Sequence, residues 1–299
     1  MDNSPSKYLN FINQALELCK EVPRHFSKFS NKIFCNHQKI TLLVLKQKLR
    51  TTYRDLVEIL KISDIPLLIG LARIPHHTTL VKFAKKIKPN LLNLLLPHRE
   101  AKITGIDGTG FEVENKSLHY QIRTARSTYR RYIKLGISAD TDKQIIMKQT
   151  INKGPRNDNK DFMPLVRDIK TNFVCADKGY DANANHTFVE RNLNAKSCIK
   201  IKEKVISKRY RSTLRKRILK TFDEETYHNR SKVESIFSSI KRKYGSCLRA
   251  RSFSTQKKEV LCKLVAYNLD RAIKYFLVGF QQSPMNRKAF IHVYTCLNI

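Results

Sequence analysis

The chain has 299 residues, of which 41% are hydrophobic, enough to bury the core of one large domain or of two unequal domains. Its 58 Lys and Arg residues against 25 Asp and Glu residues give a net charge of +33, far more than solubility requires. We therefore expect a polyanionic partner. The basic residues alternate with aromatic residues along the whole chain, which favours nucleic acid over a membrane surface. A ribosomal-type packing protein is the other basic class, but such chains are usually shorter.

The cysteines and the apolar segments indicate the cellular setting of the protein and whether it has a zinc site or a membrane segment. The seven cysteines are odd in number and scattered, with no Cys-x-x-Cys pair and no preceding signal peptide, which predicts a reducing, cytoplasmic setting. Cys35 and His37 would make only half of a zinc site. The apolar runs 65–71 and 91–96 are far shorter than the roughly 20 residues of a membrane helix. We expect no membrane segment.

Residues 1–98 are expected to form a small helical DNA-binding domain. Two apolar stripes with helical spacing are formed by Tyr53, Leu56, Val57, Ile59 and Leu60, and by Leu80, Phe83, Ala84 and Ile87. Pro75 and Thr78 mark the start of the second helix, where His76 and His77 fit turn or capping positions. Its lysines at positions 82, 85 and 86 lie off the apolar face, either against a DNA backbone or in solvent.

Residues 99–278 show an α/β order of elements, and residues 279–299 are expected to form a tail. Short apolar runs, several with a period of two, predict strands at 103–107, 132–137, 145–151, 173–176 and 198–202. The run 173–176 is apolar throughout, which is typical of a central strand buried on both faces. Helices are expected at 161–170, at 186–192, from about Asp223 onward and at 259–276.

Three carboxylates occupy comparable places in this order. Asp107 follows the apolar part of the first strand, Asp177 follows the central strand, and Glu234 lies in the helix that begins near Asp223. Acids this far apart in sequence can converge at one sheet edge. The remaining acids near these elements fit turns and solvent-facing positions: Glu112, Glu114, Asp140, Asp142, Asp158 and Asp161.

The helix from Asp223 carries the strongest pattern in the chain. Tyr227, Arg230, Glu234 and Lys241 fall at about 0°, 300°, 340° and 320° around its axis, on one narrow face. The adjoining arc is apolar: Val233, Ile236, Phe237, Ile240 and Tyr244. Arg230 is expected to keep Glu234 ionised, and Arg230 and Lys241 are suited to phosphate oxygens. A surface helix of ion pairs is the alternative.

These residues resemble a known family. Tyr227-x2-Arg230-x3-Glu234-x6-Lys241 is similar to the signature of DDE transposases from prokaryotic insertion sequences. Ile106-Asp107-Gly108-Thr109 and Ala176-Asp177-Lys178-Gly179-Tyr180-Asp181 resemble the family's two aspartate motifs. The resemblance covers most of residues 40–270, including Tyr53-Arg54-Asp55-Leu56 and Ile74-Pro75-His76-His77-Thr78-Thr79-Leu80. Asn157 is a departure, because many relatives have His before the acid that corresponds to Asp158.

The resemblance implies an RNase H-like catalytic domain, a mixed five-stranded sheet flanked by helices, behind a small all-helical N-terminal domain. It also implies that Asp107, Asp177 and Glu234 hold two Mg²⁺ ions, with Mn²⁺ as an alternative. Oxygen ligands suit such hard cations, and paired metals support in-line phosphodiester transfer. The expected reaction is cleavage at the element's ends and joining of the 3′-OH to target DNA. A homodimer would hold the two terminal inverted repeats, and the expected location is the nucleoid.

Further basic residues are expected at the DNA. Arg123, Arg126, Arg130 and Arg131 alternate with tyrosines that can stack on bases, although a solvated hairpin face is the alternative. The tract 200–220 has ten basic residues, among which we single out Lys208, Arg209, Arg211 and Arg215. Lys178, beside Asp177, and the signature residues Tyr227, Arg230 and Lys241 complete this set.

Two other functions remain open. A domesticated or inactive transposase would bind DNA without cutting it, and a repair or structure-specific nuclease on the same fold would cut DNA without joining ends. Retention of the three acids and of the flanking cations favours the active enzyme.

Overall fold

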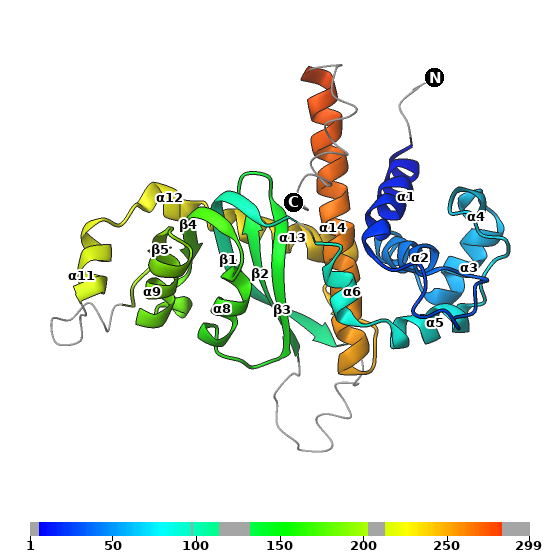
Figure 1. Ribbon diagram of the computed structural model, residues 1–299, viewed down its shortest axis with the longest axis horizontal. Coiled ribbons are helices and arrows are strands. Elements are labelled where there is room, and N and C mark those ends of the chain that lie inside the picture. Colours follow the sequence, from blue (N-terminus) through cyan, green and yellow to red (C-terminus); the bar gives the residue numbers. More distant parts are fainter. Residues whose placement is uncertain (1–5, 97, 114–131, 203–212, 283–299) are drawn as a thin grey trace. The chain divides into compact units, whose positions relative to one another are not determined.

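The computed structural model (Figure 1) describes residues 6–96, 98–113, 132–202 and 213–282, with side chains described up to residue 275. The chain divides into two compact units. The first comprises Met1–Pro97, Lys243–Gly245 and Ala250–Ile299, and the second comprises His98–Arg242 and Ser246–Arg249. The C-terminal helix thus groups with the N-terminal helices, although it follows the sheet in the sequence.

The first unit is helical in its described part. Its helices are α1 (Lys7–Leu18), η1 (Cys19–Glu21), α2 (Asn36–Lys48), α3 (Tyr53–Lys61), α4 (Ile65–Leu68), α5 (His77–Lys86), α6 (Pro89–Asn93) and α14 (Phe253–Gln282). The helix α2 packs against α1 and α14 and buries an unbroken run, Ile40–Gln47. A helix that is buried on all sides is expected at the centre of such a unit.

Side chains cap the helices of this unit. Thr52 and Asp55 form a reciprocal capping box at the start of α3, which orients the predicted apolar stripe toward the core. The ring of His76 accepts a hydrogen bond from the amide of Thr78 at the start of α5, so the expected capping role of His76 is confirmed. Leu56, Leu60 and Leu80 are almost fully buried.

The second unit is built on a mixed six-stranded sheet. Its strands are β1 (Glu100–Val113), β2 (Tyr132–Asp140), β3 (Ile145–Lys153), β4 (Lys170–Ala176), β5 (Lys196–Ile199) and β6 (Cys247–Leu248). The order is β3-β2-β1-β4-β5, and β6 pairs with the end of β1. Strands β1, β2 and β3 are antiparallel neighbours, whereas β4, β5 and β6 run parallel to their partners.

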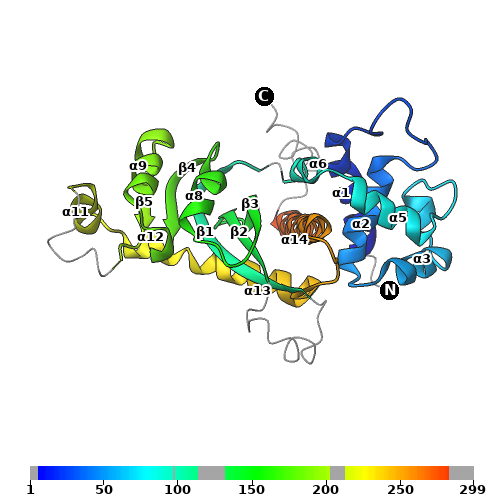
Figure 2. The same cartoon turned by 90° about the horizontal axis from the view of Figure 1, so that it is seen from below.

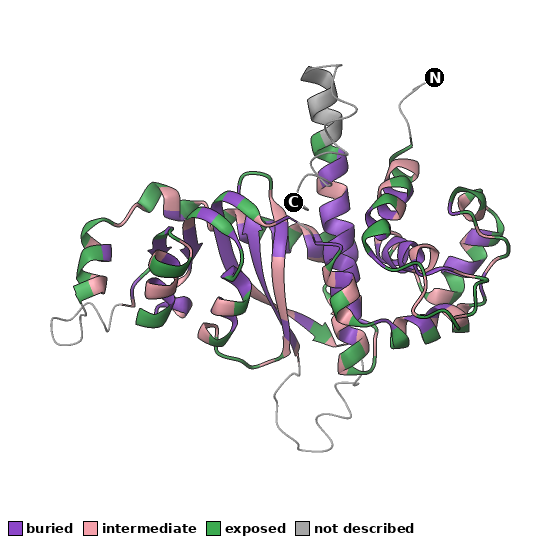
Figure 3. Cartoon of the chain, in the orientation of Figure 1, coloured by how far each residue is buried: buried purple, intermediate pink, exposed green. Residues whose placement is uncertain are grey.

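Helices cover both faces of this sheet (Figures 1 and 2). On one face, α8 (Asn159–Val166) and α9 (Asn183–Asn192) pack over a core that includes Ile106, Val174 and Phe162. On the other face lie α12 (Glu224–His228) and α13 (Ser231–Tyr244), with Val233 against Gly105. Because successive residues of a strand point to opposite faces, β1 contacts both layers. The central strands are buried accordingly (Figure 3).

The mixed sheet flanked by helices confirms the predicted fold class, with β6 as an additional strand. All five predicted strands have a counterpart, although β1 extends on both sides of the predicted 103–107 and β5 ends at Ile199, three residues before the predicted end at 202. The predicted helix 161–170 was too long at its C-terminal end. It ends at Val166, because the chain turns through Asp168, with φ of 62°, to enter β4 at Lys170. Among the described residues, no helix combines the length and the apolar character needed to cross a membrane.

The single long helix predicted from Asp223 is wrong, because the chain forms α12 and α13 with a two-residue turn between them. The amides of Arg230 and Val233 bond three residues back instead of four. The side chains of Asn229 and Ser231 donate to the carbonyls of Thr226 and His228. Such polar side chains compete with regular helix hydrogen bonds, which accounts for the break. Tyr227 therefore lies on α12, before the turn, and Glu234 and Lys241 lie on α13.

Candidate active site

Asp107 and Asp177 lie at the same level of two neighbouring parallel strands. Ile106 of β1 is in register with Ala176 of β4, and each aspartate is the next residue. Both carboxylates are oriented in the same way: Asp107 accepts from the amide of Gly108 at 2.8 Å, and Asp177 accepts from the amide of Lys178 at 2.7 Å. Adjacent strands lie about 4.8 Å apart, so the two acids begin from neighbouring backbone positions.

Arg230 joins Asp107 to the third acid of the motif. One guanidinium nitrogen of Arg230 lies 3.0 Å from Asp107 Oδ2, and the other lies 2.9 Å from Glu234 Oε1. The side chains of Arg230 and Asp107 are about one fifth exposed, and that of Glu234 is 56% exposed. The planar guanidinium presents two donors in a fixed fork, which suits it to bridge two carboxylates.

The charges of this cluster act on one another. Burial raises the pKa of Asp107, and the negative charges of Glu234 and Asp177 add to this effect, although the Gly108 amide and Arg230 oppose it. Burial lowers the pKa of Arg230, but the charges of Asp107, Tyr227, Glu234 and Asp177 outweigh it, so the net shift is upward. All three acids are therefore close enough to influence one positively charged side chain.

Packing against the sheet holds α13 beside β1. An added Cβ on Gly105 would lie 2.5 Å from Val233 Cγ2, so the absence of a side chain there lets the helix approach the strand. Farther along, Lys241 Nζ donates to Thr109 Oγ1 at 2.7 Å. Since Gly105, Asp107 and Thr109 alternate onto the same face, α13 follows the acid-bearing face of β1.

Tyr227 belongs to the same polar stripe but is largely buried, at 9% exposure. Its ring packs against Phe222 at 5.4 Å between centroids, and Lys200 Nζ lies 5.3 Å from the ring centroid. Burial raises the pKa of Tyr227, and the charge of Asp177 adds to this. The structure thus brings Tyr227, Arg230 and Glu234 together with the two aspartates in spite of the break between α12 and α13.

A second charged cluster lies on the opposite face of the sheet. Lys134, 7% exposed, donates to Asp158 at 2.5 Å and lies 3.4 Å from buried Asp161. Asp161 also accepts from Arg156 and Asn152. The expectation that Asp161 is a solvent-facing turn residue is wrong, because Asp161 lies in α8 and is 1% exposed. Its three polar neighbours offset the cost of burying its carboxylate. The one sign of this cluster in the sequence is a lysine between apolar residues in a period-two strand.

This cluster reaches the turn that follows Asp177. Asp158 lies against Gly179, where an added Cβ would come within 2.9 Å of Asp158 Oδ2. Tyr180 is 2% exposed and packs against Phe162, and its hydroxyl has no hydrogen-bond partner among the described residues. Burial raises the pKa of Tyr180, and the charges of four aspartates, Asp158, Asp107, Asp161 and Asp177, add to this. The start of α8 therefore packs against the turn that follows Asp177.

Asp181, four residues after Asp177, is fully buried and satisfied by hydrogen bonds. Its Oδ1 accepts from His186 at 3.1 Å and from two nitrogens of Arg215 at 2.8 and 3.0 Å, and its Oδ2 accepts from the Lys202 amide at 3.0 Å. His186 is held in turn by Ser197 at 2.8 Å. The Arg215 side chain, 13% exposed, is thus engaged by a buried acid.

The other sequence-predicted residues fall into two groups. Lys178 is exposed beside Asp177, and Lys241 lies on the acid-bearing face of β1. Seven of the predicted DNA contacts lie outside the described residues: Arg123, Arg126, Arg130, Arg131, Lys208, Arg209 and Arg211.

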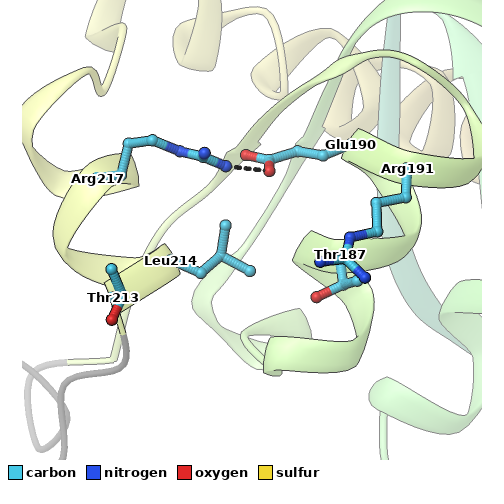
Figure 4. Close-up of a pocket in the computed structure, with 6 residues that line it drawn as sticks. All are labelled: Thr187, Glu190, Arg191, Thr213, Leu214 and Arg217. Carbon is cyan, nitrogen blue, oxygen red and sulfur yellow. Dashed lines mark hydrogen bonds and ion pairs between the residues drawn. The ribbon is translucent and has the colours of Figure 1, made fainter.

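Within the described residues, no set of three or more His, Cys, Asp and Glu side chains lies in a ready-made arrangement for a metal ion. A groove of about 390 Å³ lies elsewhere in this unit, between α9 and α11 (Thr213–Lys220) (Figure 4). Its lining residues are Thr187, Glu190, Arg191, Thr213, Leu214 and Arg217. None of the three motif acids lines it, and Arg217 forms an ion pair with Glu190 across it.

Comparison with known proteins identifies a family and a fold. Residues 98–269 match the family model described as "Transposase DDE domain". No match was found among curated proteins. Among solved structures, a piggyBac transposase in a synaptic complex with hairpin DNA, determined by cryo-EM, is similar with a TM-score of 0.50 and 11% identity, over 99% of this chain and 80% of that chain. The likeness concerns the fold, which is RNase H-like as the motifs implied.

Proposed function

Since the chain belongs to the transposase DDE domain family, we propose that it cleaves the ends of an insertion-sequence element and joins the freed 3′-OH to target DNA by metal-assisted phosphodiester transfer. The observation that carries this proposal is the bridge from Asp107 through Arg230 to Glu234, with Asp177 at the same level of the neighbouring strand. A family member that retains the acids and the cations between them has the groups that such a reaction requires.

Asp107, Asp177 and Glu234 would hold the divalent cations, two Mg²⁺ or Mn²⁺ ions. The donor set fits, because all three groups offer carboxylate oxygens, the ligands that hard cations prefer. Glu234 and Asp177 also lie close enough to Asp107 for their negative charges to add to the effect of burial, which raises the pKa of Asp107. Bound cations would supply a Lewis acid for the phosphate and a low-pKa water.

The protein's own cations would orient the DNA backbone. Lys241 is held near the acids by Thr109 and lies 5.9 Å from the centroid of the Phe111 ring, so its charge has a defined position. Arg230 can present its fork to phosphate oxygens, and exposed Lys178 adds a charge beside Asp177. The expected effect of these groups is to position the scissile phosphate before any bond changes.

The DNA partners would be the terminal inverted repeats and the target. The net charge of +33 supports strong, salt-dependent binding to phosphates. A homodimer would hold two ends at once, so that cutting and joining are paired, and the cytoplasmic nucleoid would be the place of action. The arginines at 123–131 and the basic residues at 208–211 remain proposed contacts with this DNA.

The test compares wild type with Glu234→Gln on labelled DNA that carries the element's ends, with Mg²⁺ or with EDTA. This substitution removes one charge at nearly constant shape. We expect 3′-end cleavage and joined products in wild type with Mg²⁺, and neither with EDTA or in the variant, while DNA binding is retained. Binding without cleavage by wild type would support a domesticated DNA-binding protein instead, and cleavage without joining would support a nuclease.

A further inference from the structure

Arg230 occupies the position between acids where a cation is required. We propose that, in the absence of DNA, Arg230 acts as an exchangeable counter-ion that competes with divalent cations for Asp107 and Glu234. DNA phosphates would draw the guanidinium away and thereby raise the affinity of the acids for metal. This inference rests on the proposed function, and it assigns to Arg230 a regulatory role in addition to phosphate contact.

The hydrogen bonds show how far the acids are already engaged. Asp107 Oδ2 accepts from Arg230 at 3.0 Å, and its Oδ1 accepts from the Gly108 amide at 2.8 Å. Glu234 Oε1 accepts from the same guanidinium at 2.9 Å. A divalent cation would need these oxygens and would also meet the positive charge of Arg230 at close range. A metal ion and the guanidinium of Arg230 therefore compete for the same carboxylate oxygens.

The geometry also allows the exchange. Arg230 lies in the turn between α12 and α13, and its side chain is 21% exposed, so it can move without unpacking a core. Its partner Glu234 is 56% exposed. The ion pair with Glu234 involves an exposed carboxylate and is therefore weak, so a phosphate that offers equivalent bonds can displace it. A buried pair would resist such a change.

Lys241, the other cation of the motif on this face, is arranged differently. Its ammonium group donates to the hydroxyl of Thr109. Arg230 thus pairs with the acids, whereas Lys241 bonds to a neutral hydroxyl. Binding energies are reciprocal, so if DNA strengthens metal binding through Arg230, metal strengthens DNA binding by the same factor.

The experiment measures Mn²⁺ binding to the full-length, DNA-free chain by electron paramagnetic resonance, in wild type and Arg230→Gln. We expect the Mn²⁺ dissociation constant to fall about tenfold in Arg230→Gln, because a competing charge is gone. Arg230→Lys keeps the charge and should stay within about threefold of wild type. Lys232→Gln is the matched control: Lys232 lies two residues after Arg230, in the first turn of α13, and its acid partner is Asp142 at 3.7 Å. Its dissociation constant should equal that of wild type.

Asp107→Asn separates the two levels of the proposal. If wild-type Mn²⁺ binding depends on Asp107 but Arg230→Gln binds Mn²⁺ no more tightly than wild type, the counter-ion role is overturned and the metal site stands. If Mn²⁺ binding never depends on Asp107, with or without end DNA, the metal site itself fails. A second readout adds end DNA to wild type: its Mn²⁺ affinity should rise, and the rise should disappear in Arg230→Gln. A rise of equal size in the variant would also overturn the counter-ion role.

Discussion

Asp107 and Asp177 are each the residue that follows the registered pair Ile106–Ala176 of β1 and β4, and each carboxylate accepts a hydrogen bond from the next backbone amide. The two acids are thus placed by strand register and oriented by their own turns. Glu234 reaches the same place by a different route, through the packing of α13 on β1. Substitutions can therefore disturb the site either through the packing of the helix or through the turns that follow the strands.

Gly105→Ala is expected to push α13 away from β1. The new Cβ would lie 2.5 Å from Val233 Cγ2 and 3.0 Å from Thr141 Cγ2, closer than packed atoms tolerate. Overpacking of this kind costs about 2 kcal/mol, measurable by urea denaturation, and it should also lower strand transfer by displacing Glu234. Gly108→Ala is the stability control, since its nearest contacts are at 3.6 Å. Equal stability of Gly105→Ala and wild type would contradict the close packing of α13.

Asp181→Asn is expected to destabilise the protein in a pH-dependent way. Burial raises the pKa of Asp181, but bonds from His186, the Lys202 amide and Arg215 outweigh it and lower this pKa from 3.8 to about 2. A lowered native pKa stabilises the fold above the unfolded value, by about 2 kcal/mol here, and that stability is lost as pH falls from about 4 to about 2. The free-energy difference between wild type and variant should narrow over this range.

Asp168→Asn is the control for that measurement, because the Asp168 side chain is 77% exposed. Its denaturation midpoint should follow that of wild type at every pH. A difference between Asp181→Asn and wild type that stays constant from pH 5 to pH 2 would show that the charge of Asp181 contributes little.

Arg215→Gln is expected to change stability more than DNA binding. Its guanidinium is engaged by Asp181, so the slope of log binding constant against log salt concentration should stay at the wild-type value. Lys216, the exposed neighbour, provides the comparison: if the basic tract contacts phosphate, Lys216→Gln should reduce the slope by about 0.9. Equal reductions in both variants would place Arg215 at the DNA after all.

Lys134→Met is expected to cost about 3 kcal/mol of unfolding free energy, because it leaves the carboxylates of Asp158 and buried Asp161 without their shared cation. The turn that follows Asp177 should loosen as well, visible as faster hydrogen exchange at Gly179. Lys148→Met is the control, since its acid partner Asp168 is mostly exposed, and it should cost under about 1 kcal/mol. Similar losses in the two variants would speak against the buried network.

The sequence was sufficient to predict the five main strands of the sheet and to select candidate acids that lie near one another. Period-two runs located the strands, because one residue in two of β2 and β1 faces each helical layer, and the continuously apolar 173–176 is indeed the buried end of β4. Asp107 and Asp177 follow such runs directly. The resemblance to DDE transposases predicted the family, which the match over residues 98–269 confirms.

The rest depended on contacts that spacing does not contain. The helical angles were calculated for one continuous helix. They could not reveal the turn at Asn229, whose side chain donates a hydrogen bond to the carbonyl of Thr226. The basic tract at 200–220 predicts phosphate contact for Arg215, but charge along a sequence cannot show that a buried acid, Asp181, lies within 3 Å. Likewise, Lys134 looks like a solvent-facing strand residue until its three partners in the loop before α8 and in that helix are known.

One feature of the topology limits how Glu234 can move. Helix α13 packs on β1 in its first turn through Val233 on Gly105, and after its last turn β6 pairs with residues 112 and 113 of the same strand. A helix that is held by the same strand at both of its ends cannot open about a hinge. It can only rotate or slide slightly. Adjustments of Glu234 during a reaction cycle should therefore be changes of side-chain rotamer, made over a backbone that keeps its place.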